Sequence, residues 1–541
     1  MRCGCSKLAA TAPLGILLLT VTDARAQNPI IQEGSGDPSV KVFDGRAYVY
    51  GSHDFSPSNT TWIMKDWKVF SSADLVTWTD HGVALDDDSL PWRGVTDRDF
   101  APDAIFYNGL YYFYFSLGDG TIGVAAGASP AGPFTDILGK PLINKSTTPI
   151  GNIDPMAFQD VDGSRYLIWG EDGCYIAELN DDMKSFKGSP QKVTISGAPR
   201  YREGPFAWMY GGTYYLLYSR CGSLCSDTLD YAVASSIKGP YTYKGTIIGH
   251  CKMGNEHGSV FQLNGQWYVA YHDLYPTQYY RKTKLEFIHY TNDGEIPRVY
   301  PTDYGVGRYD GTKRIEAENF FDKSVGIRYE DCTDEGNGFD IADIGNSSWL
   351  KYQNVDFGVG ADSFQARVSP GSGASSIEIR LGGIDGALVW TCDVAAGDGT
   401  WTTVGTGLRG TVTGISDVFL VFNGETDNLL RLNWVRFTSS TDGGSGSDGS
   451  DEVEAAPACK VPPEAAGCSC GLGRNLGLAR GGLPLCILAA LGLLQRPRIR
   501  SRRIRSVAAR GPAPGAGSSP RPEAVPPSRK LVAKSPFQTP G

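Results

Sequence analysis

Apolar and aromatic residues alternate with polar ones through the first 310 residues, in short runs that meet at glycine turns. Strict alternation is the pattern of a half-buried strand, and Asp-Gly, Asn-Gly or Gly-Gly between two such runs predicts a β-hairpin. Five hairpins recur, with turn glycines at Gly45, Gly109, Gly163, Gly211 and Gly265. Their spacing of roughly 50–65 residues is typical of four-stranded propeller blades. The pattern predicts an all-β, five-bladed β-propeller.

An ionisable residue stands at the head of each hairpin. These head residues are Asp37, Asp103, Asp154, Glu203 and His257. The innermost strands of a propeller converge on its axis, so we expect the heads to face one funnel. Hydrolysis of a glycosidic bond needs such a set, because one carboxyl group protonates the leaving oxygen and another activates water or attacks the sugar. Asp before Pro, as at Asp37 and Asp154, is also a common turn signal, but its repetition with Glu203 favours a site.

The hydrophobic pattern changes after residue 312. Shorter alternating strands with glycine turns predict a β-sandwich over 313–438, which follows the propeller at 27–312. A Gly/Ser/acidic linker is expected at 439–457. Segment 458–505 carries a Cys motif, a short apolar run and an arginine cluster, and 506–541 is expected to be a disordered tail. The apolar run is shorter than the roughly 20 residues of a transmembrane helix.

Composition and charge point to a secreted protein that binds a neutral polymer. Residues 1–26 join basic residues, an apolar stretch and the small-residue site Ala24-Arg25-Ala26, which predicts a secretory signal rather than a short buried helix. The formal net charge is −9, although the segment from Arg496 onward is strongly basic. An acidic main body argues against nucleic acid and anionic membranes as partners.

Cys221 and Cys225 have the spacing of half a zinc site without a second half, which favours a loop disulfide.

Several motifs in the propeller segment resemble glycoside hydrolase family 43 over roughly residues 27–310. They are Gly36-Asp-Pro-Ser39, the segment 64–82, Ala101-Pro-Asp103, Asn152-Ile-Asp-Pro155 and Arg202-Glu-Gly-Pro205. The resemblance implies a five-bladed propeller that hydrolyses arabinose- and xylose-containing plant polysaccharides with inversion. It makes Asp37 the general base, Glu203 the general acid and Asp154 the residue that tunes and orients the acid. Inversion implies an acid-to-base separation of roughly 6.5–9.5 Å, which admits a water molecule.

Several further residues are candidates for contact with substrate. Arg281 matches a family arginine that can contact substrate, although a solvated role stays open, and Asp103 is also expected to contact substrate. Aromatic rings suit the apolar face of a sugar, and the candidates for stacking are Trp62, Trp67, Trp92, Phe100 and Trp208. Most of these rings are expected in the core, and Phe100, beside Ala101-Pro-Asp103, is the one expected near the funnel. His257 matches a histidine near the propeller centre where some members hold calcium or another ion. A buried structural histidine is the alternative, because calcium prefers oxygen ligands. No cofactor is required for the chemistry.

The second segment resembles a family 6 carbohydrate-binding module, a jelly-roll sandwich. Arg314-Ile-Glu-Ala-Glu318 and Leu432-Asn-Trp-Val-Arg-Phe437 carry this resemblance. It implies a structural calcium at Glu316 and Glu318, and sugar binding by Asn433 together with one ring from Trp401 or Trp390. Asp343 stands where a second aromatic residue is usual, which leaves open whether the module binds sugar.

Together these features predict a secreted or cell-surface hydrolase that releases α-L-arabinofuranose or β-D-xylose from arabinoxylan or xylan. An endo-acting arabinan hydrolase and a non-catalytic sugar-binding propeller are the alternatives. The segment 458–505 resembles the C-terminal sorting signals of myxobacterial surface proteins and provides the one expected association with a membrane. The chain continues beyond its arginines to Gly541, unlike those signals, and a disordered tail is the alternative.

Overall fold

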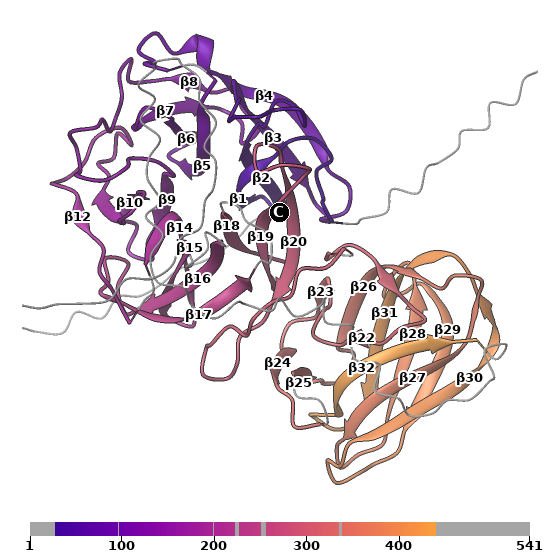
Figure 1. The fold of residues 1–541 in the computed structure, drawn as a ribbon. Coiled ribbons are helices and arrows are strands. Elements are labelled where there is room, and N and C mark those ends of the chain that lie inside the picture. The colour runs from indigo at the N-terminus through magenta and orange to yellow at the C-terminus, as the bar shows by residue number, and fades with distance from the viewer. Residues whose placement is uncertain are drawn as a thin grey trace, which may run out of the picture. The chain divides into compact units, whose positions relative to one another are not determined.

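The computed structural model of this chain describes residues 28–95, 97–197, 200–221, 227–249, 256–303, 305–334 and 338–439 (Figure 1). Within these ranges the regular structure consists of strands and one short 3-10 helix, Asp87–Ser89. In the same ranges no helix has the length and apolar character needed to span a membrane. The predicted secretory signal, the loop 222–226 that contains Cys225 and the segments from 440 onward lie outside the described residues, so the predicted loop disulfide is not described.

The first two sheets follow the predicted hairpin pattern. The first sheet has the order β1 (Gly36–Phe43), β2 (Arg46–Ser52), β3 (Asp66–Ser72) and β4 (Thr79–Asp86). The second has the order β5 (Asp99–Tyr107), β6 (Leu110–Leu117), β7 (Thr121–Gly127) and β8 (Thr135–Asp136). All neighbouring strands in both sheets are antiparallel, as short connections require.

Three further sheets complete this part of the chain. The third contains β9 (Met156–Gln159), β10 (Arg165–Trp169), β11 (Tyr175–Glu178) and β12 (Gln191–Lys192). The fourth contains β14 (Tyr201–Tyr210), β15 (Thr213–Cys221), β16 (Asp227–Ala234), β17 (Tyr241–Gly249) and the short parallel strand β13 (Ile195–Ser196). The fifth contains β18 (Gly258–Leu263), β19 (Gln266–Leu274) and β20 (Arg281–Ile288).

The hairpin turns have the local chemistry that the sequence predicted. In the turn Asp44-Gly45 both central residues have positive φ, +50° and +71°, and Asn108-Gly109 has +49° and +83°. Both are the left-handed conformations that a two-residue hairpin turn requires. The third hairpin differs, because β9 and β10 pair through Gln159 and Arg165 across a longer loop.

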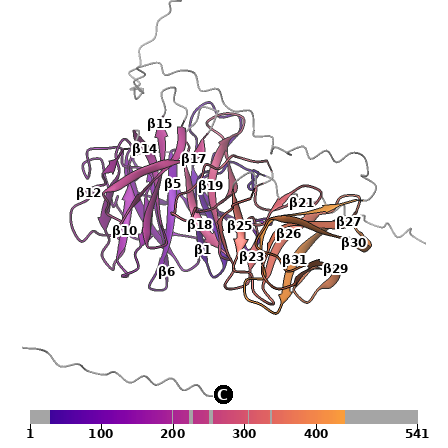
Figure 2. The same cartoon turned by 90° about the horizontal axis from the view of Figure 1, so that it is seen from below.

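The first strands of the five sheets form a closed ring. Strand β1 contacts β5 and β18, and the circle continues from β5 to β9, from β9 to β14 and from β14 to β18. Figure 1 shows the sheets radiating from these strands, and the view turned by 90° shows the strands running along the central axis (Figure 2). The architecture is that of a β-propeller.

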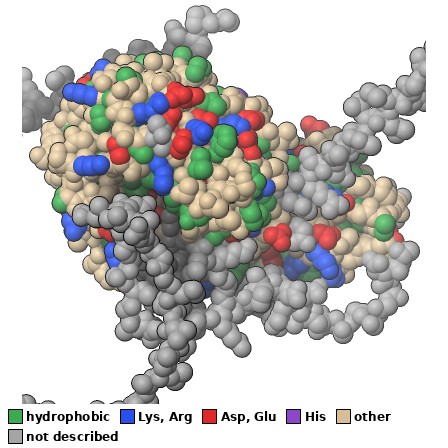
Figure 3. Space-filling view, turned by 45° about the horizontal axis from the view of Figure 1, so that its top comes forward, with side chains coloured by type: hydrophobic (Ala, Val, Ile, Leu, Met, Phe, Trp, Pro, Cys, Tyr) green, Lys and Arg blue, Asp and Glu red, His purple; other side chains and the backbone are tan. Residues whose placement is uncertain are grey.

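Aromatic side chains fill the spaces between adjacent sheets. Trp67 of β3 packs against Phe113 and Phe115 of β6, with ring centroids 6.0 and 4.8 Å apart. Trp169 of β10 lies in the next cluster, together with Tyr114 of β6. On the face shown in Figure 3, acidic and basic side chains are interspersed over the propeller surface.

The remaining strands form the predicted β-sandwich. One sheet has the order β21 (Tyr309–Asp310), β26 (Trp349–Asp356), β31 (Ile415–Gly424), β28 (Ser375–Leu381) and β29 (Ala387–Val394), and β23 (Asp322–Lys323) pairs with β26. The other has the order β24 (Arg328–Asp331), β25 (Phe339–Ala342), β32 (Leu430–Thr438), β27 (Ala361–Pro370) and β30 (Thr402–Val412), and β22 (Ile315–Glu316) pairs with β32. Alternate residues of both sheets, such as Phe364 and Leu420, are buried in one core.

Candidate active site

Local backbone distortions set the three predicted catalytic carboxylates apart from the regular strands. Asp37 interrupts the pairing of β1 with β2, and two irregularities flank Glu203 in β14. Asp37 and Asp154 have φ values of +51° and +57°. Residues other than glycine rarely adopt this left-handed conformation, and such strain concentrates at functional sites. The backbone strain at Asp37 and Asp154 therefore marks both positions as candidates for a functional site.

Asp37 is buried and held by cationic and hydroxyl groups. Its Oδ1 accepts a hydrogen bond from Arg281 Nη1 at 2.5 Å, and its Oδ2 accepts one from Ser52 Oγ at 2.6 Å. Its backbone N–H donates to His272 Nδ1 at 3.0 Å. Burial alone would raise the pKa of Asp37, but the charges of Arg281 and His257 outweigh it and hold the pKa well below its usual range. The carboxylate is thus kept ionised, as a general base must be.

Arg281 is buried and joins two carboxylates. Its Nε and Nη2 donate to Asp54, at 2.9 Å each, while Nη1 binds Asp37. The guanidinium also lies 4.6 Å from the ring centroid of Trp62, within range of a cation–π interaction. The structure therefore places Arg281 in the site as the partner of the proposed base. Its contact with substrate stays a prediction.

Asp154 binds the backbone next to Glu203. Its Oδ2 accepts a hydrogen bond from the N–H of Gly204 at 3.0 Å, and its own N–H donates to Ser116 Oγ at 3.3 Å. Burial raises the pKa of Asp154 to about 6; the charge of His257 opposes this shift and that of Asp37 adds to it. A carboxylate in this position fixes the loop that carries Glu203, which is the geometry expected of an orienting residue.

His257 connects the base to the segment that carries the acid. Its Nδ1 lies 3.4 Å from Asp37 Oδ1, and its ring packs so closely on Gly204 that an added Cβ there would be 3.1 Å from Cδ2. Burial lowers the pKa of His257, but the charges of Asp154 and Asp37 outweigh it and raise the pKa above its usual value. Within the described ranges, the one group of three clustered ligand-type side chains does not include His257. An ion at this histidine stays a prediction.

Glu203 is buried beside its neighbour Arg202, whose Nε lies 3.6 Å from Glu203 Oε2. Arg202 also forms an ion pair with Glu171 at 2.9 Å. Glu203 stands opposite Ser219 of β15 in the ladder. Asp37 and Asp154 are connected through His257 and Gly204, and Glu203 directly precedes Gly204 in β14.

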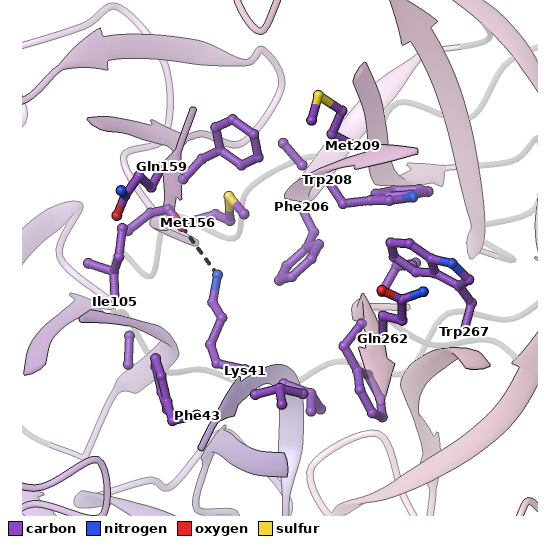
Figure 4. Close-up of a pocket in the computed structure, with 18 residues that line it drawn as sticks. Lys41, Phe43, Ile105, Met156, Gln159, Phe206, Trp208, Met209, Gln262 and Trp267 are labelled. Carbon is purple, nitrogen blue, oxygen red and sulfur yellow. Dashed lines mark hydrogen bonds between the residues drawn. The ribbon is translucent and has the colours of Figure 1, made fainter. Parts of the chain in front are cut away.

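Asp103 of β5 uses its carboxylate for contacts within the propeller. It is buried, accepts hydrogen bonds from Ser39 Oγ and from Ala157 N at 2.6 Å, and pairs with Lys41 Nζ at 3.0 Å. Further along the same strands lies a cavity of about 300 Å³, into which Lys41 extends beside Phe206 (Figure 4). None of the three predicted catalytic carboxylates lines this cavity. Asp103 thus forms an internal ion pair, and its predicted contact with substrate is untested.

The predicted aromatic contacts divide into core and exposed groups. Trp67 and Trp208 are buried, whereas Phe100 and Trp62 are partly exposed. Trp62 covers Arg281 and meets Tyr279 edge-on, with ring centroids 5.1 Å apart. Because Arg281 binds Asp37, Trp62 is the aromatic ring that the contacts tie most directly to the site.

Sequence reasoning missed the residues that support the heads from neighbouring strands. Ser52, Ser116 and His272 each bind Asp37 or Asp154 and each stands seven residues after a turn glycine. That shared offset is a signal that could have identified them. Asp54 carries no such signal, because its partner Arg281 is 227 residues away in the chain.

In the sandwich, the predicted sugar-binding residues use their polar atoms internally. Asn433 is buried and donates to Asp334 Oδ2 at 3.0 Å. Trp401 donates from Nε1 to Thr333 Oγ1 at 3.2 Å, and the guanidinium of Arg431 lies 5.7 Å from its ring centroid. Asp343 pairs with Arg328. These contacts leave the sugar-binding role of Trp401 and Asn433 a prediction.

The predicted calcium ligands of the sandwich fit a cation in part. Glu318 is buried, and its Oε2 has no hydrogen-bond partner among the described residues. Burial and the neighbouring charge of Glu316 raise the pKa of Glu318 well above its usual range. Glu316 is already paired with Arg314, from Nε to Oε1 at 2.7 Å. The unpartnered oxygen suits a hard cation, which would also offset the repulsion between the two carboxylates.

Comparison with known proteins assigns both parts of the chain to families. Residues 26–296 match the family model for glycosyl hydrolases family 43. The chain belongs to this family. It is therefore a glycosidase, and residues 316–439 match the model for carbohydrate binding module (family 6). The resemblances of the propeller segment and of the sandwich segment to these two families are confirmed, and that of the segment 458–505 to a sorting signal stays a prediction.

Three relatives illustrate the range of this glycosidase family. The chain is 33% identical over 481 residues to an arabinoxylan arabinofuranohydrolase of Bacillus subtilis, covering 76% of this chain and 92% of the relative. It is 31% identical over 483 residues to an arabinoxylan arabinofuranohydrolase of Paenibacillus polymyxa, covering 77% and 75%. A xylosidase/arabinosidase 43A of Humicola insolens is 32% identical over 330 residues, covering 49% and 97%.

Proposed function

We propose that this family 43 glycosidase releases single pentose units, α-L-arabinofuranose or β-D-xylose, from arabinoxylan or xylan with inversion at the anomeric carbon. The observation that carries the proposal is the convergence of Asp37, Asp154 and Glu203 through His257 and Gly204. The ring of five sheets supports a five-bladed propeller whose funnel holds these residues.

The proposed reaction assigns one proton transfer to each catalytic carboxyl group. Glu203 donates its proton to the glycosidic oxygen as the bond to the anomeric carbon breaks. Asp37, held ionised beside Arg281, takes a proton from the water that attacks that carbon from the opposite face. Asp154 keeps the Glu203–Gly204 segment in place through its bond to the Gly204 N–H. Before the next cycle Asp37 releases its proton to solvent, and Glu203 regains one from solvent.

The relatives favour arabinofuranose as the sugar released. Two arabinoxylan arabinofuranohydrolases align with the chain through both the propeller and the sandwich, whereas the xylosidase/arabinosidase aligns over about half of the chain. An endo-acting arabinan hydrolase remains the second candidate, supported by a 32% identity over 160 residues to a probable arabinan endo-1,5-α-L-arabinosidase of Aspergillus niger. The two activities differ in product, since an endo-acting enzyme releases oligosaccharides.

We also propose that the protein acts outside the cell or on its surface. The signal-like residues 1–26 support export, and the segment 458–505 supports retention at the surface through its sorting-like motif. In this setting the sandwich would hold xylan near the propeller, with a calcium ion at Glu316 and Glu318. Microscopy of the producing cells with an antibody to the propeller, with and without residues 458–505, would test retention.

The decisive experiment measures sugar release by the wild type and by Glu203→Ala. The substrates are arabinoxylan, xylan, debranched arabinan and the p-nitrophenyl pentosides, and nuclear magnetic resonance reads the anomer formed first. We expect arabinose from arabinoxylan, inverted configuration and a loss of activity of at least about 100-fold in the variant. Full activity of Glu203→Ala would disprove the assignment of the acid. Oligosaccharides from debranched arabinan would favour the endo-acting candidate.

A further inference from the structure

The cavity drawn in Figure 4 lies at the end of the propeller channel opposite the predicted catalytic carboxylates. Its volume is about 300 Å³, and the first strand of each of the five sheets contributes to its lining. Along β1 the chain runs from the head residue Asp37 to Lys41, which lines the cavity, a rise of roughly 13 Å. Along β14, Glu203 likewise precedes Phe206. We call this cavity the rear pocket; its lining residues include Lys41, Phe206, Gln262 and Trp267.

Buried polar contacts separate the rear pocket from the head residues. Ser39 Oγ donates a hydrogen bond to Asp103, and Ser259 Oγ donates one to the carbonyl of Pro38 at 2.9 Å. Ser39, Asp103 and Ser259 are all buried. These residues follow Asp37 along β1 or face it from neighbouring strands, so the two ends of the channel are distinct recesses.

The rear pocket carries no net charge. Lys41 is the one ionisable side chain among the described residues that line it. Its Nζ forms an ion pair with Asp103 Oδ2 at 3.0 Å and donates a hydrogen bond to the carbonyl of Ala157 at 3.2 Å. The positive charge of Lys41 is therefore already balanced by a buried carboxylate. This balance favours a neutral ligand over an anion.

Several hydrogen-bond donors at the rear pocket are not used inside the protein. An ammonium group has three protons, and Lys41 uses two of them in the contacts above. The amide of Gln262 is exposed and the indole of Trp267 is partly exposed, and neither side chain forms a hydrogen bond with a described residue. Trp208 lines the same pocket, but its Nε1 donates to the hydroxyl of Tyr290 at 2.8 Å. A ligand could therefore bind Gln262 and Trp267 without breaking an internal hydrogen bond.

Gln262 and Trp267 form a pair at the rear pocket. They stand directly opposite each other in the β18–β19 ladder, which places both side chains on one face of the sheet. Tyr210 and Tyr290 meet the indole edge-on, with ring centroids 5.9 and 5.6 Å away, and fix its position. Figure 4 shows the Gln262 amide beside the indole, across the pocket from Lys41. The pair thus offers an apolar ring next to hydrogen-bonding groups.

We propose that the rear pocket binds a neutral sugar, as one pentose unit that is either free or at the end of a xylan-type chain. A sugar has an apolar face for the indole and hydroxyl groups for the Gln262 amide and the third proton of Lys41. An apolar ligand would leave these donors unpaired, which costs free energy. The cavity volume is at the lower end of the roughly 300–1,000 Å³ of small-molecule pockets, and so suits a single sugar unit.

The rear pocket would bind sugar without hydrolysing it. Hydrolysis of a glycosidic bond by this family's mechanism needs two carboxyl groups, and none of the described residues that line the pocket has one. The pocket would give the protein a contact with its polymer or product on the face opposite the active site. The choice of a pentose rests on the proposed function, whereas the preference for a neutral, hydroxyl-rich ligand rests on the pocket alone.

The test incorporates fluorotryptophan into the full chain and follows fluorine nuclear magnetic resonance signals during titration with sugar. Trp→Phe variants assign the signals of Trp267 in the rear pocket, Trp62 beside Arg281 and Trp401 in the sandwich. D-xylose and L-arabinose are titrated into the wild type, and xylotriose into Glu203→Ala to limit its hydrolysis. Gln262→Leu is the decisive variant, because it removes the amide of an exposed side chain. Gln191→Leu, at an exposed position of β12, is the matched control.

We expect the Trp267 signal to shift with a Kd on the order of 1–10 mM for the pentoses. Gln262→Leu should raise this Kd about 3- to 10-fold, the effect of one lost hydrogen bond, while Gln191→Leu leaves it unchanged. A lower Kd for xylotriose than for xylose would identify the chain end as the ligand, and equal values the free sugar.

The three tryptophan signals separate failure of this proposal from failure of the proposed function. The rear-pocket site is overturned if Trp267 does not respond while Trp62 does, if Gln262→Leu leaves the Kd unchanged, or if glycerol at equal concentration gives the same shift. A response of Trp267 without one of Trp62 would support the rear pocket and count against the proposed active site. If neither signal moves with any of the sugars, both proposals fail.

Discussion

At the scale of single residues, Asp54 supports the charge on the proposed base, Asp37, through Arg281 and without binding Asp37 itself. Asp54 holds two nitrogens of Arg281, and Arg281 presents the third to Asp37. A guanidinium fixed on both sides cannot swing away from the base, so Asp54 is a positioning residue. Its carboxylate also balances the charge that Arg281 brings into a buried site.

The pKa of Asp154 leads to a pH-dependent difference in stability. Burial raises this pKa from 3.8 in the unfolded chain to about 6 in the folded protein, so the folded state holds the proton more tightly. The resulting stabilisation is complete below pH 4 and is lost as the pH rises to about 6 and beyond. Asp154→Asn lacks this titration and keeps a side-chain oxygen for the Gly204 N–H. Relative to the wild type, we expect the free energy of unfolding of the variant to rise by up to ~3 kcal/mol between pH 4 and pH 7.

Calorimetric unfolding of the propeller at pH 4, 5, 6 and 7 measures this difference, with Asp293→Asn as an exposed control. A wild-type-to-variant difference that stays constant across this range would contradict the raised pKa.

The sequence indicated these residues unequally, for physical reasons. The heads Asp37, Asp154 and Glu203 repeat at one position of a regular pattern, so the pattern could place them together. Their roles came from the family motifs. Asp54 and Asp99 could not be predicted in this way. Asp54 is distinguished by its buried hydrogen bonds to Arg281, 227 residues away in the chain, and Asp99 by its burial without a hydrogen-bond partner among the described residues.

At the scale of elements, the irregular part of β14 positions residues of the candidate active site. Gly204 has a φ of +65° and lies against His257, whereas Gly211, in the β14–β15 turn, has a φ of +57° and nothing within 4 Å of an added Cβ. Alanine at either position meets similar backbone strain, which costs about 1–3 kcal/mol. Only at position 204 must the histidine ring move as well.

We therefore expect Gly204→Ala and Gly211→Ala to lower Tm to a similar extent but to differ in activity. Displacing His257 and the Gly204 N–H disturbs the contacts of Asp37 and Asp154, which should lower kcat about 10- to 100-fold. Gly211→Ala should keep wild-type kcat. Steady-state kinetics on p-nitrophenyl arabinofuranoside, paired with calorimetry, make the comparison. Equal kcat values for the two variants would show that the contact with His257 does not matter.

The strands themselves were predictable where alternation was strong. Strands next to the axis and their hairpin partners combine aromatic and branched residues with glycine turns, and the structure has them at the expected places. Outer strands such as β12 (Gln191–Lys192) were not predicted. Both of its residues are exposed, so this edge strand has no alternation of apolar and polar residues by which it could be recognised.

At the scale of the whole molecule, catalysis and attachment to the polymer can be separated by experiment. Asp37, Asp154 and Glu203 lie in the propeller segment, while Trp401 is in the sandwich, where its ring is half-buried against Thr333 and Arg431. An aromatic ring is the side chain best suited to the apolar face of a sugar. The sandwich lacks the usual second ring at Asp343, so we expect one aromatic residue to supply most of its affinity.

Trp401→Ala should reduce retention on insoluble arabinoxylan about 10-fold, since a hot-spot aromatic residue contributes about 1–2 kcal/mol or more to binding. Its kcat/KM on p-nitrophenyl arabinofuranoside should equal that of the wild type, because this substrate needs only the propeller. Trp434→Ala, which removes the ring beside Arg314, is the matched control and should bind like the wild type. If Trp401→Ala is retained like the wild type and the Tm of the sandwich is unchanged, the module binds sugar through another face. A parallel loss on the small substrate would instead mean that the two functions are not separable.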